Sequence, residues 1–344
     1  MAALAAILGS TLVLLTSAHA KTPAAVGPAP RTTPATPAAT RPAAPGKTAG
    51  AAGPPLTLAA AQAALAEYTA VNNGANAARS DSELAMVETG GSYAIDVAQY
   101  AVQRASGRPL YPAFAPVAAT YYIPQAEPAG GPRWFVARVA NAFSANPKKV
   151  TSTEYLLFTQ AAPGGAWRNA VEPYLLPGAN APQIAVGGNG LATAVGGTAT
   201  ALAATPGQLA GLTAASLDGA GGAVTVPNPG GLPDRVDQKF WQNKLPSATV
   251  TDAHAAATGT VGQMFALRTT NGGALVFYTD SAELTIIAHP GSTLHLSVPG
   301  FYSPADPLTR AGLAYLDQFA AYDPPPGAGH PTVIAEYSGP TAKN

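Results

Sequence analysis

The stretch RWFVARVANAF, residues 133–143, is rich in aromatic and β-branched residues and contains neither glycine nor proline. This composition is typical of a β-strand. Runs of similar composition lie at VAATYYIP (117–124), TEYLLFTQ (153–160) and WRNAVEPYLL (167–176). The turn-forming segment AAPGGA (161–166) separates the last two runs. The spacing therefore predicts an antiparallel meander of consecutive strands.

Helices are expected before this meander. Apolar residues recur at helical spacing through residues 58–71, and Thr57 stands where an N-cap is needed. Residues 81–91 predict a second short helix that stops at Gly90–Gly91, and residues 92–107 predict a third that ends at Gly107. Helices followed by an antiparallel meander indicate an α+β fold.

The same order of elements begins again near residue 200. Two helical candidates, 205–219 and 232–245, are followed by a hairpin whose turn is Asn271-Gly272-Gly273. Strand-like runs continue to the end of the chain, at residues 282–289, 313–322 and 332–339. The second half therefore repeats the predicted arrangement of helices before strands.

Three segments of the first half have similar counterparts, in the same order, in the second. Residues 135–138 (FVAR) parallel 265–268 (FALR), EYLLFTQ parallels GALVFYT, and PGANAPQIAV (177–186) parallels PGAGHPTVIA (326–335). Together they predict two tandem modules, 56–200 and 201–344. We expect each to have N-terminal helices packed on a curved antiparallel sheet.

The N-terminal segment predicts export. Residues 1–20 contain an apolar run that ends in Ala18-His19-Ala20, a pattern that signal peptidase recognises. The run is shorter than the roughly 20 apolar residues of a membrane-spanning helix. An uncleaved N-terminal anchor is the alternative. We expect a secreted or cell-wall-associated protein with no transmembrane segment in its mature chain.

Residues 21–55 are rich in alanine, proline and threonine, with almost no large apolar residue. Such a segment buries too little surface to offset the entropy of ordering it, so we expect a disordered spacer. It either carries the folded part away from a membrane or wall, or has no role of its own.

Charge and cysteine content exclude several classes of function. The formal net charge is zero and only 10% of residues are charged, which does not favour nucleic-acid binding. Cysteine is absent, which rules out a thiol nucleophile, a cysteine-ligated metal and a lipid-modified cysteine. The expected partner is an unidentified envelope ligand or protein.

The sequence contains no recognisable motif for catalysis or cofactor binding. Neither a Gly-x-Ser-x-Gly elbow nor a complete phosphate-binding loop is present. No two histidines have the i, i+4 spacing of a helical zinc site, although His289 and His295 could meet across a turn. We therefore assign no catalytic residue, no metal ligand and no cofactor.

Aromatic residues gather in the first predicted meander and suggest half a core and half a pocket or surface patch. Glu154 and Glu172 lie in the same strands, where one carboxyl could point into a cone-shaped cavity and act as a base. The other acids, Asp96 and Asp280 among them, are expected to face water. The candidate pocket or patch residues are Tyr122, Trp134, Tyr155, Trp167, Glu154 and Glu172.

Five segments carry a resemblance to a known family: YTAVNNGANAA, VETGGSYAI, RWFVAR, GLATAV and the closing FAAYDPP with VIAEYSG. Together they resemble a family of actinobacterial cell-envelope proteins of unknown function, many of them lipoproteins, over roughly residues 57–344. The resemblance implies an envelope location but no activity or site residues. The missing lipid-bearing cysteine is a departure from many members. By order of elements alone, each half is also similar to cystatin-like and nuclear-transport-factor-2-like modules.

The leading hypothesis is an exported, non-enzymatic protein that binds an envelope ligand or partner. One alternative is an isomerase-like or dehydratase-like enzyme that uses a cone-shaped cavity for acid/base chemistry. A second alternative is a purely structural interaction scaffold. A carboxyl of Glu154 or Glu172 in an open cavity beside tyrosine or histidine would favour the enzyme, and cavities filled by Trp134, Leu156 and Phe158 would disfavour it.

Overall fold

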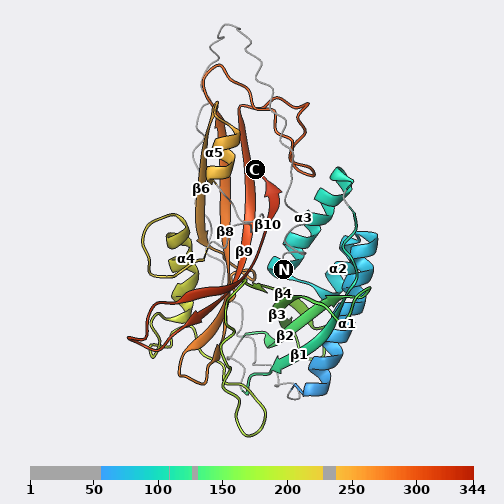
Figure 1. Ribbon diagram of the computed structural model, residues 1–344, viewed down its shortest axis with the longest axis vertical. Coiled ribbons are helices and arrows are strands. Elements are labelled where there is room, and N and C mark those ends of the chain that lie inside the picture. The colour runs from blue at the N-terminus through green and yellow to red at the C-terminus, as the bar shows by residue number, and fades with distance from the viewer. Residues whose placement is uncertain (1–55, 108, 126–130, 228–237) are drawn as a thin grey trace, which may run out of the picture.

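The computed structural model describes residues 56–344 apart from residues 108, 126–130 and 228–237 (Figure 1). The predicted signal and spacer, residues 1–55, lie outside the described residues. The helices are α1 (Leu58–Ala78), α2 (Asp81–Val87), α3 (Gly90–Ser106), the 3-10 turn η2 (Pro206–Gln208), α4 (Leu209–Leu217) and α5 (Gln238–Lys244). The strands are β1 (Phe114–Tyr122), β2 (Arg133–Phe143), β3 (Val150–Gln160), β4 (Arg168–Val171), β5 (Tyr174–Leu175), β6 (Ala248–Ala256), β7 (Phe265–Arg268), β8 (Ala274–Ala288), β9 (Arg310–Asp323) and β10 (Thr332–Lys343).

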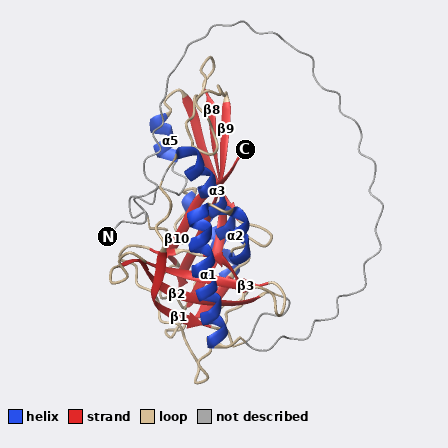
Figure 2. Ribbon diagram, turned by 90° about the vertical axis from the view of Figure 1, so that its right-hand side faces the viewer, coloured by secondary structure: helices blue, strands red, loops and turns tan. Residues whose placement is uncertain are grey.

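All ten strands belong to one antiparallel sheet in the order β1-β2-β3-β5-β10-β9-β8-β6, with β4 beside β3 and β7 beside β8. The α+β class predicted from the sequence is therefore confirmed. The sheet is strongly twisted, so that β1, β2 and β3 run across the direction of β8 and β9 in Figure 2.

The predicted modules share this one sheet. Each half of the chain supplies consecutive strands, and the halves join where Tyr174 and Leu175 of β5 pair with Glu336 and Ala335 of β10. Two of the three similar segments fall on corresponding pairs, β2 with β3 and β7 with β8. The third does not, because 326–335 leads into β10 whereas 177–186 forms only isolated bridges. The duplication therefore stays a prediction.

Strand β2 is buried on both faces, which explains its near-continuous apolar sequence. On the inner face Trp134 packs against Phe265 of β7, with ring centroids 5.2 Å apart. Tyr155 of β3 meets Phe277 of β8 at 5.5 Å on the same face. The twisted sheet thus folds over onto itself and encloses an aromatic core between its two halves.

The outer face of β2 and β3 is covered by the helices of the first half (Figure 2). Helix α1 starts as predicted, with the Thr57 hydroxyl accepting a hydrogen bond from the Ala60 N–H. The prediction that Gly90–Gly91 stops the second helix is wrong, because α2 ends at Val87 and Gly90 begins α3. Gly91 lets Gln318 approach closely, since a Cβ there would lie 2.4 Å from the Gln318 amide nitrogen and would require this side chain to move.

The second half differs from the sequence expectation in its longest strand. The runs 274–279 and 282–289 were predicted as separate strands, but β8 passes through both without a turn. Its residues pair with β9 from Ala274 to Ile287 and also with β6 or β7. The predicted hairpin turn at residues 271–273 is confirmed between β7 and β8.

Side-chain amides cap part of both sheet edges. Asn73 of α1 both donates to the Phe114 carbonyl and accepts from the Phe114 N–H at the start of β1. At the opposite edge Gln242 of α5 donates to the Ala248 carbonyl of β6 and accepts from the Val250 N–H. These contacts satisfy backbone groups that would otherwise be available to pair with another strand.

Candidate functional site

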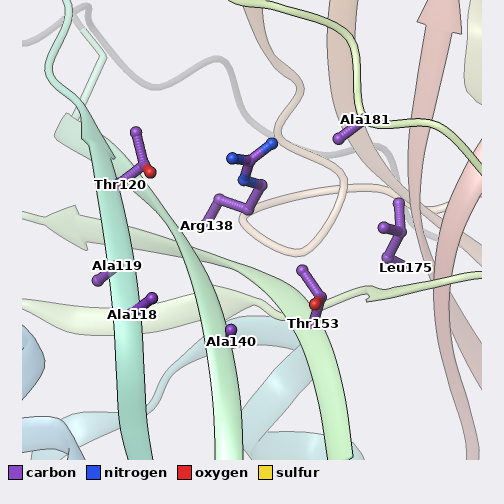
Figure 3. Close-up of a pocket in the computed structure, with 8 residues that line it drawn as sticks. All are labelled: Ala118, Ala119, Thr120, Arg138, Ala140, Thr153, Leu175 and Ala181. Carbon is purple, nitrogen blue, oxygen red and sulfur yellow. The ribbon is translucent and has the colours of Figure 1, made fainter. Parts of the chain in front are cut away.

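A cavity of about 280 Å³ opens on the inner face of the sheet, beside the aromatic core. It is lined by Ala118, Ala119, Thr120, Arg138, Ala140, Thr153, Leu175 and Ala181. Figure 3 shows the Arg138 side chain extending from β2 into the space between Thr120 and Ala181. The site is therefore built by β1, β2 and β3, by the end of β5, and by the loop that follows it.

The cavity results from the same alternation that forms the core. Residues two apart on a strand share a face, so Arg138 and Ala140 continue the inner face begun by Trp134 and Val136. Beyond Val136, however, the large apolar side chains give way to alanine and threonine on three adjacent strands. The aromatic core therefore ends at this point, and the small side chains beyond it leave the cavity open.

Arg138 is the only charged residue among the eight that line the cavity. It is half-buried, and within the described part of the chain no carboxylate lies at ion-pair distance from it. Its neighbours are two tyrosines. Burial raises the pKa of the Tyr155 and Tyr122 hydroxyls, and the nearby Arg138 guanidinium partly opposes both shifts.

The six candidate residues from the sequence fall into three places. Tyr122, Trp134 and Tyr155 are buried in the aromatic core that borders the cavity. Trp167 lies on the opposite face, where it meets Phe135 at 5.1 Å. Glu154 and Glu172 lie in a buried polar network under the helices. None of the six lines the cavity itself.

That polar network links α1 to β3, β4 and β5 and to the end of α2. The Tyr68 hydroxyl lies 3.1 Å from Glu172 Oε2 and 3.4 Å from Glu88 Oε1. The Asn72 amide donates to Glu88 Oε1 at 2.8 Å, and the Asn169 amide donates to Glu172 Oε2 at 2.5 Å. Hydroxyls and amides thus hold the carboxyls between the helices and the sheet.

Two further carboxyls complete the network. Asn141 of β2 donates to Glu154 at 2.5 Å, and Tyr337 of β10 donates to Asp96 of α3. Asp96 was expected to face water, and this is wrong, since only 8% of the residue is exposed. Its carboxyl lies on the side of α3 that packs on β10, a strand more than 200 residues away in sequence.

Burial dominates the electrostatics of these acids. It raises the pKa of Asp96 to about 6 and that of Glu154 to about 7, against the lowering effect of their hydrogen bonds. Burial also raises the pKa of Glu88 and Glu172 well above the ordinary value, with the charge of Asp96 adding to both shifts. The interactions that oppose these shifts are hydrogen bonds from neutral groups, and burial outweighs them, so each carboxyl keeps its proton to a higher pH than it would in water.

A separate pair of buried acids lies on the face of the sheet opposite this network, where Asp280 of β8 stands opposite Asp317 of β9. Neither residue is exposed, so the expectation that Asp280 faces water is wrong. Burial, and then the facing Asp317, raise the pKa of Asp280 to about 9. Both Asp280 oxygens lack hydrogen-bond partners among the described residues.

Arg138 and Glu88 were missed as site residues in the sequence. The signal for Arg138 was present, because it stands in phase with Trp134 and Val136 in an otherwise apolar stretch of strand. Glu88 gave no comparable signal, since it follows a short helix and its burial depends on α1.

The remaining acids and histidines suggest no metal centre. His254 lies 2.7 Å from Asp218, which follows α4. Among the described residues, no group of three or more histidine, aspartate and glutamate side chains is arranged to hold a metal ion. Within the same residues, none of the helices is both long enough and apolar enough to cross a membrane.

Comparison with known proteins gives a family but no activity. No curated protein and no solved structure matches the chain. The model of one protein family matches residues 52–344, which include every helix and strand of the fold. The chain therefore belongs to the family DUF8094, a domain of unknown function.

Proposed function

We propose that this protein is an exported, non-enzymatic binding protein of the cell envelope, and that it holds a small ligand in the cavity beside Arg138. The cavity carries this proposal. It is concave and is lined by small apolar side chains together with a few polar groups, which is the usual composition of a small-molecule site. Its volume of about 280 Å³ suits a small ligand.

The location in this proposal rests on the N-terminal sequence. Residues 1–20 have the apolar run and the small residues of a cleavable signal, and residues 21–55 have the composition of a spacer. The segments that resemble actinobacterial envelope proteins point the same way. Cysteine-free composition is compatible with an exported domain of this size.

The acid/base alternative has weaker support. Glu154 and Glu172 do lie beside tyrosines, as an acid/base site would require, but both are buried and neither lines the cavity. Thr153 faces the cavity, so the next residue, Glu154, points to the opposite face of β3. A general acid or base must reach its substrate directly or through one water, and a carboxyl under the helices is poorly placed to do so.

A ligand-detected thermal shift tests the binding proposal, because a ligand that binds only the folded chain raises its melting temperature. The purified chain is screened against small amphiphiles and fragments of wall polymers. Each hit is repeated with Ala140→Phe, which fills the cavity, and with Ala253→Phe, which places the same ring on an exposed position of β6. Circular dichroism checks that both variants are folded.

We expect Ala140→Phe to abolish the shift and Ala253→Phe to retain it. An equal shift in both variants would place the ligand elsewhere and refute the cavity as the binding site. A screen in which no compound stabilises the wild-type chain would instead favour the structural scaffold.

A further inference from the structure

We propose that the cavity selects amphiphilic ligands with a single anionic head group, a carboxylate or a phosphate ester, which the Arg138 guanidinium binds while an uncharged apolar body fills the rest. This inference rests on the proposed binding function and specifies its ligand class. It goes beyond that function because a cavity could equally select a neutral or a cationic ligand.

The preference for an anion follows from the surroundings of the Arg138 guanidinium. Several other arginines of the chain have partners: Arg104 lies 3.3 Å from Asp81, Arg268 donates to the Gly272 carbonyl, and Arg133 donates to Gln160. Arg138 interacts with the Tyr155 hydroxyl but has no acid or carbonyl partner within the described part of the chain, although it is half-buried beside an aromatic core. A cation withdrawn from water without a counter-ion is unfavourable, so an anion that binds there supplies the missing interaction.

Guanidinium chemistry narrows the head group. Its planar fork matches the two oxygens of a carboxylate or a phosphate and binds them through two parallel hydrogen bonds. The hydroxyls of Thr120 and Thr153 also line the cavity and can donate to the same group. Since Arg138 is the only charged lining residue, polyanions such as nucleoside triphosphates would be poorly neutralised.

The walls define the rest of the ligand. Ala118, Ala140 and Ala181, with Leu175, leave an apolar surface of small side chains next to the charged group. An alkyl or similar uncharged chain buries apolar area against these residues, and this burial adds to the binding free energy in proportion to the area removed from water. A small anion without an apolar body would therefore bind more weakly than an amphiphile with the same head group.

Four probes share the same eight-carbon chain and differ only in the head group: octanoate, octyl phosphate, octanol and octylamine. Their affinities separate the contribution of the head-group charge from that of the apolar body. Isothermal titration calorimetry measures the dissociation constant of each for the wild-type chain and for Arg138→Met, which keeps an unbranched side chain and removes its charge. Arg310→Met removes an exposed arginine of β9 and is the matched control. Acetate, which has the carboxylate without the long alkyl chain, measures how much that alkyl chain contributes to the affinity of octanoate.

We expect octanoate or octyl phosphate to bind at least tenfold more tightly than octanol, octylamine and acetate. Arg138→Met should weaken the preferred anion at least tenfold, which corresponds to about 1.4 kcal/mol, and should leave octanol unchanged. Arg310→Met should behave as the wild type. The ratio of the two anions then decides between a carboxylate and a phosphate head group.

Two failures can be told apart. The anion inference is overturned if octanol binds as tightly as both anions and if Arg138→Met changes the affinity for none of the three. Loss of octanol binding in Ala140→Phe would show that the proposed binding function survives this result. If the anions bind but Ala140→Phe leaves their affinity unchanged, both the cavity and the inference fail.

Discussion

Replacing Asp280 by asparagine removes an ionisable carboxyl from the middle of β8, where the residue is fully buried. Burial and the facing Asp317 raise the pKa of Asp280 from 3.8 to about 9. Between these two values the folded chain holds a proton at this site that the unfolded chain has released. The free energy of unfolding therefore falls by roughly 1.4 kcal/mol for each pH unit across this window.

The sign follows from the direction of the shift. The stabilising contribution of protonated Asp280 is complete below pH 3.8, declines as the pH rises, and is lost once the pH passes about 9. Between pH 5 and pH 8 the loss amounts to about 4 kcal/mol. An asparagine side chain would stay neutral throughout, so relative to the wild type the Asp280→Asn variant should gain about 4 kcal/mol over this range.

Urea unfolding followed by tryptophan fluorescence at pH 5, 6, 7 and 8 measures the effect as a difference in slope. The buried acids that do not contact Asp280 titrate alike in both proteins, so their contributions cancel in that difference. Asp317 faces a neutral side chain in both proteins over this range, either the protonated Asp280 or the introduced asparagine. Glu283→Gln is the matched control, because Glu283 is an exposed carboxyl three positions along the same strand. The reasoning is refuted if Asp280→Asn has the pH dependence of the wild type, which would mean that the carboxyl keeps its ordinary pKa in the folded chain.

Three substitutions test the packing. Trp134→Ala should lower the free energy of unfolding by about 3–5 kcal/mol in urea melts, because the indole is buried against Phe265; a loss under about 1 kcal/mol would show that it is not core. Tyr68→Phe should cost about 1–3 kcal/mol, since two buried carboxyls lose a hydrogen-bond partner, and an unchanged melting temperature would contradict this. Gly339→Ala should cost about 1–3 kcal/mol by calorimetry, because its Cβ would lie 2.6 Å from Ile95 Cγ2; wild-type stability would mean that α3 does not pack this closely on β10.

Local features were predicted well from the sequence. The Thr57 cap, the strands at 133–143 and 153–160, and the turn at 271–273 occur where the pattern placed them. The three N-terminal helices occur in the predicted order, although the boundary between the second and the third was misplaced. Each depends on residues close together in the chain, through helical spacing, strand alternation or turn chemistry. The α+β class follows from their order.

Features that depend on distant segments could not be predicted in this way. Asp96 is buried by β10, and Asp280 is buried by the sheet around it, although both have the charge that usually places a residue in water. The position of β10 between β5 and β9 likewise leaves no local signal. Because β10 pairs with a strand of each half, the two sheets expected from the sequence form a single sheet.

The candidate site was predicted only at its border. Tyr122, Trp134 and Tyr155 were chosen as large aromatics in the first meander, and they do border the cavity. The cavity itself forms where side chains are small, and the absence of a bulky group is harder to detect in a sequence than its presence. Arg138 could be placed in the cavity only once its neighbours on β1 and β3 were known.

The place of β10 has a consequence for biogenesis. The strand begins at Thr332, close to the end of the chain, yet it is hydrogen-bonded to both halves of the sheet. Until the ribosome releases β10, β5 and β9 have no neighbour at their facing edges. The sheet therefore cannot close until residues 332–343 have been synthesised, and a chain truncated before Thr332 should be a ready substrate for proteases.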